Sequence, residues 1–196
     1  MVTGARSWLA AQPAEQRPAR MGLGVTAAIA QNPPRPSTCS LPMPLKIRQR
    51  KSSIHGNGVF ALAAIAEGER IIEYKGELRS HDEVDGGDAG DVESGHTFLF
   101  TLNDEWVIDG TRKGNVARWI NHSCAPNCQA LIVEHAHDRR RDKVVIEALR
   151  PIAEGEELTY NYGIRLAERH TARLKKIWAC HCGAASCTGT LLQPKR

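Results

Sequence analysis

Two short segments of this chain carry the side chains that most often bind metals or take part in catalysis. The first is residues 118–128, with the sequence RWINHSCAPNC, which holds two thiols, an imidazole and two side-chain amides. The second is residues 180–187, with the sequence CHCGAASC. Because five thiols fall into two clusters far apart in the sequence, we expect the end of the chain to fold back onto its middle.

The spacing of the second cluster is typical of a metal site. Cys180, Cys182 and Cys187 bring three thiolates close together, and Zn²⁺ prefers four soft ligands in a tetrahedron. The fourth ligand must come from elsewhere, and both Cys124 and Cys128 are candidates. Free thiols or a disulfide are the alternatives, but six cysteines in 196 residues are too few for a disulfide scaffold and fit a reducing compartment. We therefore predict a structural zinc site that closes the tail.

Composition limits the remaining classes of protein. The 196 residues are 41% apolar, which allows one ordinary domain plus a tail. No apolar run reaches the roughly 18 residues that a membrane span needs, so no membrane is expected. The net charge of +4 fits ordinary solubility. A small zinc-ribbon nucleic-acid protein is a rival reading, but the thiols lack two Cys-x-x-Cys knuckles, and no direct sequence-specific nucleic-acid binding is expected.

The first 44 residues differ from the rest of the chain. They are rich in Ala, Pro, Gln and Arg, with Glu15 as their only acid. Such a stretch cannot bury much apolar surface, so we predict a disordered N-terminal extension over residues 1–44. A targeting segment is the alternative, because the stretch contains Arg and is poor in acids.

The rest of the chain favours a mainly β fold. It has many short runs of β-forming residues, many Gly turns and little helical periodicity. Asn57-Gly58 between apolar residues predicts a hairpin turn. Residues 79–96 read as a flexible or partly helical insert, residues 115–120 as a short helix and residues 164–177 as a linker or short helix. The predicted strands are residues 46–50, 70–74, 97–102, 106–109, 130–134, 143–148 and 158–163.

Two histidines between predicted strands, His135 and His137, could touch a metal. A solvated charged loop is the favoured interpretation, because no third ligand lies nearby in the sequence.

Together these segments resemble the SET-domain family of protein-lysine N-methyltransferases. The segment RWINHSCAPNC is similar to the family's Asn-His-Ser-Cys-x-Pro-Asn signature, and IHGNGVFA at residues 54–61 is similar to its N-terminal cofactor motif. EYKGE, ELTYNYG and CHCGAASCTGTL follow in the family's order. The resemblance covers residues 46 to 192 and is to the SET plus post-SET type, with no cysteine-rich pre-SET segment.

The resemblance implies a β-clip of short sheets with a C-terminal pseudoknot, in which the segment after Tyr160 passes beneath the loop of Asn121 and His122. It implies a SET domain over residues 45–165, a linker over 166–178 and a zinc-binding post-SET segment over 179–196. S-adenosylmethionine would bind on one face, and a lysine would enter from the other through a narrow channel.

The implied activity is transfer of a methyl group to the ε-amine of a protein lysine. The expected substrate is a histone tail or another basic protein, and the expected location is a bacterial cytoplasm or a eukaryotic nucleus. The alternative is a catalytically inactive SET-like module that binds lysine or chromatin.

The resemblance also assigns roles to residues. Tyr162 matches the catalytic tyrosine, Tyr160 the position that tunes how many methyl groups are added, and Tyr74 a wall of the channel. The implied zinc ligands are Cys124, Cys180, Cys182 and Cys187, which leaves Cys128 and Cys39 outside the site. The implied cofactor contacts are His55, Gly56, Asn57, Gly58, Phe98, Arg118, Asn121 and His122.

Three positions depart from the family's common residues. Phe98 stands where many members carry Tyr, Trp119 replaces the commoner Phe, and Asn161 replaces the commoner Asp. None of them is the catalytic tyrosine, so we expect activity to survive.

Overall fold

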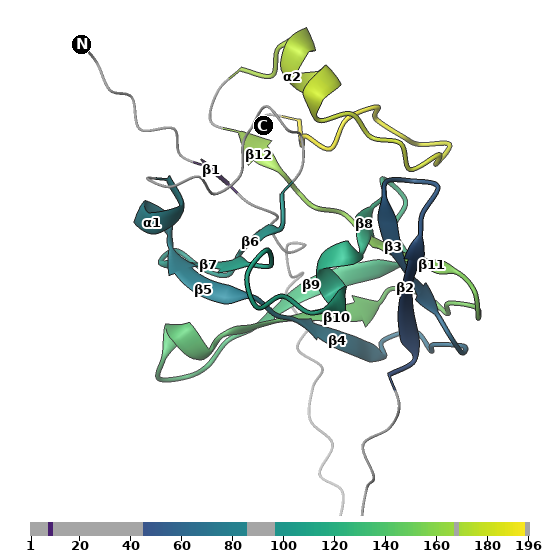
Figure 1. The fold of residues 1–196 in the computed structure, drawn as a ribbon, viewed down its shortest axis with the longest axis horizontal. Coiled ribbons are helices and arrows are strands. Elements are labelled where there is room, and N and C mark those ends of the chain that lie inside the picture. The colour runs from purple at the N-terminus through teal and green to yellow at the C-terminus, as the bar shows by residue number, and fades with distance from the viewer. Residues whose placement is uncertain (1–7, 10–44, 86–96, 167–168, 195–196) are drawn as a thin grey trace, which may run out of the picture. The chain divides into compact units, whose positions relative to one another are not determined.

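The structure, a computed structural model, describes residues 8–9, 45–85, 97–166 and 169–194. The predicted disordered extension therefore lies outside the described residues, except for the two-residue strand β1 (Trp8–Leu9). The second half of the predicted insert over 79–96 also lies outside them. All the elements described below belong to one compact unit. The fold is mainly β, as predicted, with short strands in small sheets and few helices (Figure 1).

The first sheet has four strands in the order β2-β3-β11-β8. They are β2 (Ile47–Lys51), β3 (Asn57–Ala61), β11 (Glu157–Tyr160) and β8 (Asn121–His122). Strands from the two ends of the domain thus lie side by side, and β8 joins the sheet in parallel with β11.

The predicted hairpin is present, but its turn lies earlier than predicted. Strands β2 and β3 pair in antiparallel register, with Lys51 opposite Asn57, so Asn57 and Gly58 belong to a strand. The turn is closed by the Ser52 N–H, which donates to the carbonyl of Gly56 at 3.1 Å. Gly56 supplies the positive φ of +46° that the turn requires.

A second sheet has the order β4-β10-β9 and carries much of the core. It consists of β4 (Arg70–Tyr74), β10 (Lys143–Ala148) and β9 (Cys128–Val133). Alternate residues of β10 are buried, which fits a strand with one face on the core. The loop between β9 and β10 contains a 3-10 helix, η3 (Arg139–Arg141).

The third sheet has the order β5-β7-β6. Strand β5 (Glu77–Ser80) pairs with β7 (Trp106–Asp109), and β7 pairs with β6 (Leu99–Thr101). The short helix α1 (His81–Asp85) follows β5, which confirms the helical part of the predicted insert. The predicted hairpin of β6 and β7 is confirmed, and β5 extends it.

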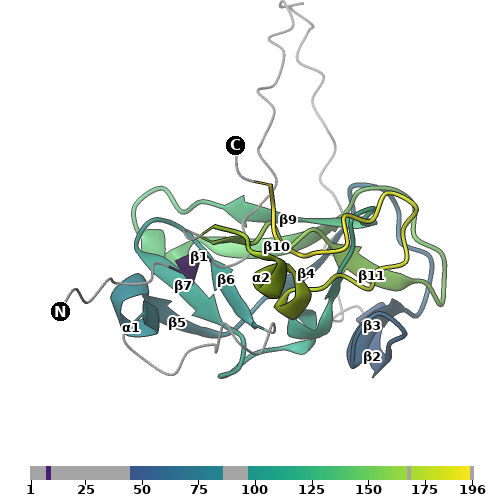
Figure 2. The same ribbon diagram turned by 90° about the horizontal axis from the view of Figure 1, so that it is seen from above.

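Beyond β11 the chain leaves the first sheet and forms a small separate layer (Figures 1 and 2). Strand β12 (Arg165–Leu166) pairs with β1, and helix α2 (Ala172–Ile177) begins after Thr171, whose side chain accepts from the N–H of Leu174. Of the two predictions for residues 164–177, a linker or a short helix, the structure confirms a short helix at the end of the segment. A second apolar cluster packs here and consists of Ile164, Leu166, Leu174, Trp178 and Leu192.

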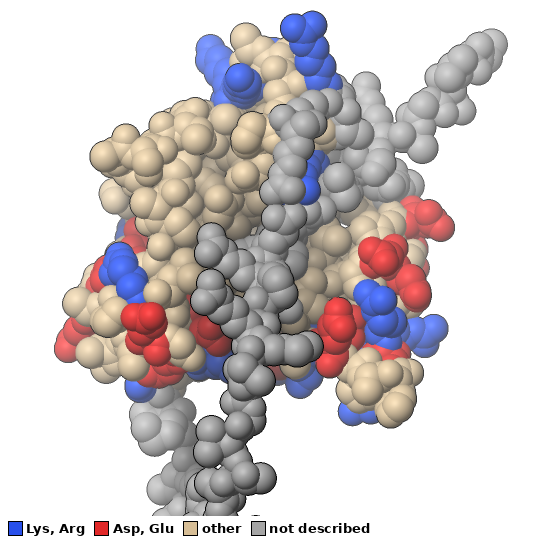
Figure 3. Space-filling model, turned by 180° about the vertical axis from the view of Figure 1, so that it is seen from behind, with Lys and Arg blue, Asp and Glu red and all other residues tan. Residues whose placement is uncertain are grey.

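Charged side chains of both signs are interspersed over the lower part of the face in Figure 3, and the basic side chains at its top lie over α2. The last turn of α2 carries Lys175 and Lys176. None of the helices in the described part of the chain is both long and apolar enough to cross a membrane.

The parallel pairing of β8 and β11 is held by a buried amide. Asn127 is only 2% exposed, and its Nδ2 donates to Glu156 Oε1 at 2.9 Å and to the carbonyl of Glu157 at 2.8 Å. Its Oδ1 accepts from the N–H of Thr159 at 2.8 Å. One side chain thus fixes the start of β11 against the loop that follows β8.

Replacing Asn127 by Ala should lower the free energy of unfolding by about 2–4 kcal/mol, because the four hydrogen bonds of its side chain are lost and the buried Thr159 loses this acceptor. Urea denaturation of the full chain measures the change. Asn161→Ala is the matched control, because Asn161 is exposed, and it should change stability far less. Equal effects of the two substitutions would contradict the proposed role of Asn127.

Candidate active site

A single pocket collects most of the predicted site residues. It encloses about 790 Å³ of empty space, part of it open to solvent. Its walls come from the turn before β3, the two residues before β6, the 3-10 helix η2 (Val116–Trp119), β8 and the C-terminal tail. The lining residues are Ile54, His55, Gly56, Asn57, Thr97, Phe98, Arg118, Trp119, Asn121, His122, Tyr162, Trp178, Ala179, Cys180, His181 and Leu191.

Asn121 holds the turn before β3 against the pocket. Its Nδ2 donates to the carbonyl of Asn57 at 2.9 Å and to that of His55 at 3.3 Å. The backbone of residues 55–57 therefore has a fixed position at the wall, although its residues are partly exposed.

The wall formed by η2 is both aromatic and cationic. The guanidinium of Arg118 lies 4.7 Å from the ring centroid of Trp119 and 5.6 Å from that of Phe98. The two rings contact each other edge to face, with centroids 5.0 Å apart. Arg118 also donates to the carbonyl of Gly110 at 3.0 Å, so its charge has a defined position beside the pocket.

His122 is a buried, uncharged side chain. Its Nδ1 accepts from the N–H of Tyr162 at 3.1 Å, so the proton of the neutral ring is on Nε2. Nε2 lies 3.5 Å from the sulfur of Cys124. Burial lowers the pKa of His122 to about 4, which keeps the ring neutral at pH 7. His122 therefore links Tyr162 to the cysteine cluster.

Three tyrosines gather beside the pocket. The rings of Tyr160 and Tyr162 lie 4.9 Å apart. The Tyr162 hydroxyl donates to the carbonyl of Ile120 at 2.9 Å, and the Tyr74 hydroxyl donates to that of Phe98 at 2.7 Å. The Tyr160 hydroxyl has no hydrogen-bond partner in the part of the chain that the structure describes.

The tyrosines remain protonated at neutral pH. Burial is the main cause that raises the pKa of Tyr74, Tyr160 and Tyr162 above the usual value. The three hydroxyl groups can therefore donate or accept hydrogen bonds but do not act as anionic bases.

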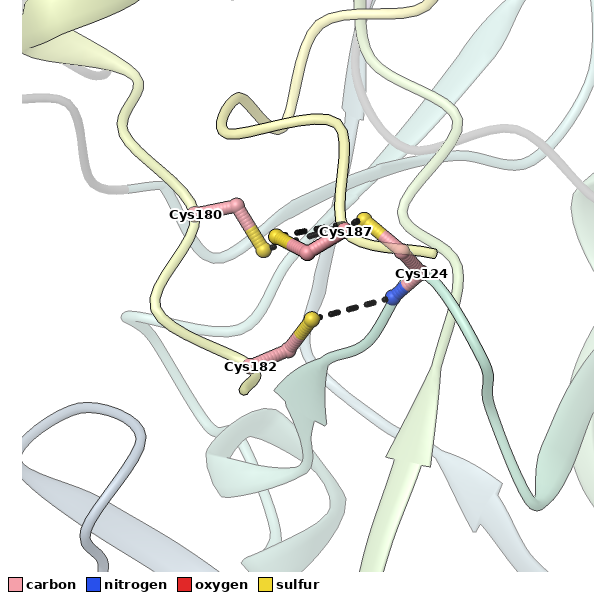
Figure 4. A group of neighbouring side chains, drawn as sticks. All are labelled: Cys124, Cys180, Cys182 and Cys187. Carbon is pink, nitrogen blue, oxygen red and sulfur yellow. Dashed lines mark hydrogen bonds between the residues drawn. The ribbon is translucent and has the colours of Figure 1, made fainter. Parts of the chain in front are cut away.

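Four cysteines meet at one end of the pocket (Figure 4). The sulfurs of Cys124, Cys180, Cys182 and Cys187 all lie within 4.8 Å of one another. Cys124 Sγ is 3.9 Å from Cys180 Sγ and 4.0 Å from Cys187 Sγ. A tetrahedron of sulfurs about 2.3 Å from a zinc ion has edges of about 3.8 Å, so this arrangement fits the metal.

The pKa of the Cys182 thiol is lowered. Partial burial raises its pKa, but hydrogen bonds from backbone N–H groups, first that of Cys124, and from neighbouring thiols lower it to about 6. Of the two candidates for the fourth ligand, the structure brings Cys124 to the cluster. Cys128 is buried in β9, and burial raises its pKa to about 12. Among the described residues, His135 and His137 belong to no group of potential metal ligands.

The predicted site residues are largely brought together. Of the predicted cofactor contacts, only Gly58 does not line the pocket. A Cβ at that position would overlap Glu157 Oε1, so Gly58 makes room for a carboxylate. Tyr74 and Tyr160 lie behind the lining, next to Tyr162 and Phe100.

Sequence reasoning missed Trp178, which lines the pocket and is 3% exposed. The one signal was its place two residues before the cysteine cluster. It also missed Asn127, although that residue lies in the segment singled out first.

The fold and the site together define a SET domain, and the chain belongs to this family, whose SET domain matches residues 56–163. The chain is similar to three fungal proteins named "Histone-lysine N-methyltransferase, H3 lysine-4 specific". It is 41% identical to that of Neurospora crassa over 147 residues, 40% to that of Schizosaccharomyces pombe over 154 and 41% to that of Saccharomyces cerevisiae over 143.

These matches cover 72–75% of this chain but only 11–16% of the length of the three relatives. The likeness is therefore confined to the SET region and the residues beside it.

Proposed function

We propose that this chain is an S-adenosylmethionine-dependent protein-lysine N-methyltransferase. The observation that carries the proposal is the pairing of β8 with β11, which sets Asn121 and His122 at the pocket wall beside Tyr160 and Tyr162. Membership of the SET family supports the same conclusion. An inactive binding module would not need the tyrosine hydroxyl and the cofactor pocket to meet at one place.

The pocket has the chemistry that S-adenosylmethionine requires. Arg118 offers a cation for a carboxylate, and the backbone of residues 55–57 and the amide of Asn121 offer hydrogen-bonding groups. Trp119 and Trp178 offer aromatic surface to a base. When bound, the cofactor supplies a methyl group on a positively charged sulfur, and we propose that His55, Gly56, Asn57, Phe98, Arg118, Asn121 and His122 contact it.

The protein's own residues would act on the lysine chiefly by placing it. A free lysine is mostly protonated at neutral pH, with a pKa of about 10.4. Channel walls formed by Tyr74, Tyr160 and Tyr162 exclude water and so disfavour the ammonium form. The Tyr162 hydroxyl and the carbonyl of Ile120 can then orient the amine, and the rings can hold a methylated ammonium.

The substrate that the relatives' names indicate is a lysine of histone H3. We propose a histone or another basic protein as the substrate of this chain, which in a eukaryote would place it at chromatin. No nucleic-acid contact is needed for this activity.

The cysteine cluster supports a second part of the proposal, a structural zinc ion held by Cys124, Cys180, Cys182 and Cys187. The tail that carries three of these ligands also supplies Ala179, His181 and Leu191 to the pocket wall. The ion would fix that wall, because the small apolar cluster of the tail contributes little burial of its own.

Replacing Tyr162 by Phe should lower the rate of methyl transfer at least about 100-fold, because an oriented hydroxyl at the reacting centre is lost. A radiolabelled methyl-transfer assay on mixed histones measures the rate. Cofactor affinity and the thermal midpoint should stay close to those of the wild type, and a wild-type rate in the mutant would refute the role of Tyr162.

Replacing Tyr160 by Phe should raise the methylation state of the product. The Tyr160 hydroxyl has no hydrogen-bond partner among the described residues and occupies space that further methyl groups would need, and the residue is only 5% exposed. Mass spectrometry of a methylated peptide should show mainly monomethyl product for the wild type and more di- and trimethyl product for the mutant. Abundant trimethyl product from the wild type would contradict this role.

Cys124→Ala should remove the bound zinc, whereas Cys128→Ala should keep it. The two substitutions delete the same atoms four residues apart, but only Cys124 lies among the other sulfurs. Metal content after purification, measured by atomic emission, separates the two. Equal zinc contents in the two variants would exclude Cys124 as a required ligand.

A further inference from the structure

The side-chain amide of Asn121 has its orientation fixed by the groups behind it. Its Nδ2 lies 2.8 Å from Glu157 Oε1, 2.9 Å from the carbonyl of Asn57 and 3.3 Å from that of His55. A carboxylate and two backbone carbonyls can only accept hydrogen bonds. The nitrogen of the amide must therefore point towards them, and the oxygen must point elsewhere.

That oxygen is available to a ligand. Among the described residues, Asn121 Oδ1 has no hydrogen-bond donor, and it is not one of the four side-chain polar atoms that are buried without a partner. Asn121 is only 7% exposed and lines the pocket. The side-chain oxygen of Asn121 is thus a directed acceptor at this wall of the pocket.

The carboxylate of Glu157 is itself held in place. Ser52 Oγ lies 2.8 Å from its Oε1 and 2.9 Å from its Oε2 and donates to this carboxylate. Gly58 leaves the space that the carboxylate fills, because a Cβ there would overlap Oε1. Its charge acts on the site, since burial first and the negative charge of Glu157 second raise the pKa of Tyr162.

We propose that Glu157 is a positioning residue for the amino-acid end of the cofactor. It accepts from Asn121, keeps Oδ1 facing the pocket and polarises the amide so that Oδ1 accepts more strongly. Such an acceptor suits a cationic ammonium, and Arg118, three residues earlier in the chain, suits the carboxylate on the same carbon. The inference rests on the proposed function, because it takes S-adenosylmethionine to be the ligand.

The test compares two ligands that differ only at that end. S-adenosylhomocysteine carries the amino acid, and 5′-methylthioadenosine lacks it. Calorimetric titration of the full chain should show Glu157→Ala weakening S-adenosylhomocysteine about tenfold, the size of one lost charge-assisted hydrogen bond, and 5′-methylthioadenosine less than about twofold. Glu157→Gln and Ser52→Ala should give smaller losses with the same selectivity.

The ratio of the two affinities is the readout, because a partly unfolded sample alters the measured stoichiometry and not this ratio. Glu69→Ala is the matched control, since Glu69 is also hydrogen-bonded, to Lys46 at 2.8 Å, but does not line the pocket. It should leave the ratio unchanged.

Equal weakening of both ligands in the Glu157 variants, or no weakening of either, would overturn the inference and leave the proposed function standing. A wild-type chain that binds neither ligand would overturn the proposed function and the inference with it.

Discussion

The site depends on one short piece of parallel pairing. Asn121 and His122 lie beside Thr159 and Tyr160 although some 38 residues separate them along the chain. Two paired residues make few hydrogen bonds, so the contact needs further support, and the buried side chain of Asn127 supplies it with four more. Tyr160, Tyr162 and the pocket wall formed by Asn121 and His122 therefore become neighbours through polar contacts of high sequence separation.

The second constraint is that burial keeps His122 and the three tyrosines beside it uncharged. Burial acts in opposite directions on the two kinds of group, raising the pKa of the tyrosines and lowering that of His122, and both shifts favour the uncharged form. Such an environment offers hydrogen bonds without a strong base. It suits a reaction in which a lysine must lose its proton to solvent before it enters and then needs only to be aligned.

Much of this arrangement could be predicted from the sequence, because runs of β-forming residues separated by Gly turns predict short strands joined by turns. Residues 143–148 were predicted as a strand and form β10 with the same bounds. The predicted strand over 158–163 ends earlier, at Tyr160, because the Asn161 side chain accepts from the N–H of Gly163 and turns the chain. A local side-chain hydrogen bond of this kind competes with strand pairing and leaves a weak signal.

Other features depend on contacts that no local pattern encodes. Spacing alone left Cys124 and Cys128 equal as the fourth ligand, and only the fold decides which thiol faces the tail. The Asn57-Gly58 pair suggested a turn, but Gly58 is needed for the close approach of Glu157, a residue about 100 positions away. Trp178 was missed for a similar reason, because most of the residues that line the pocket with it lie far away in the sequence.

The pocket draws its walls from residue 54 to residue 191. A small molecule that fills it would therefore contact the opening hairpin, the middle of the chain and the tail at once, and would add to the contacts of Tyr162, which packs against both apolar clusters. Because a ligand that binds only the folded state stabilises it by mass action, a bound molecule would raise the melting temperature of the whole domain and not that of the tail alone. The cofactor would then stabilise the fold, and its cellular concentration would affect the lifetime of the folded protein.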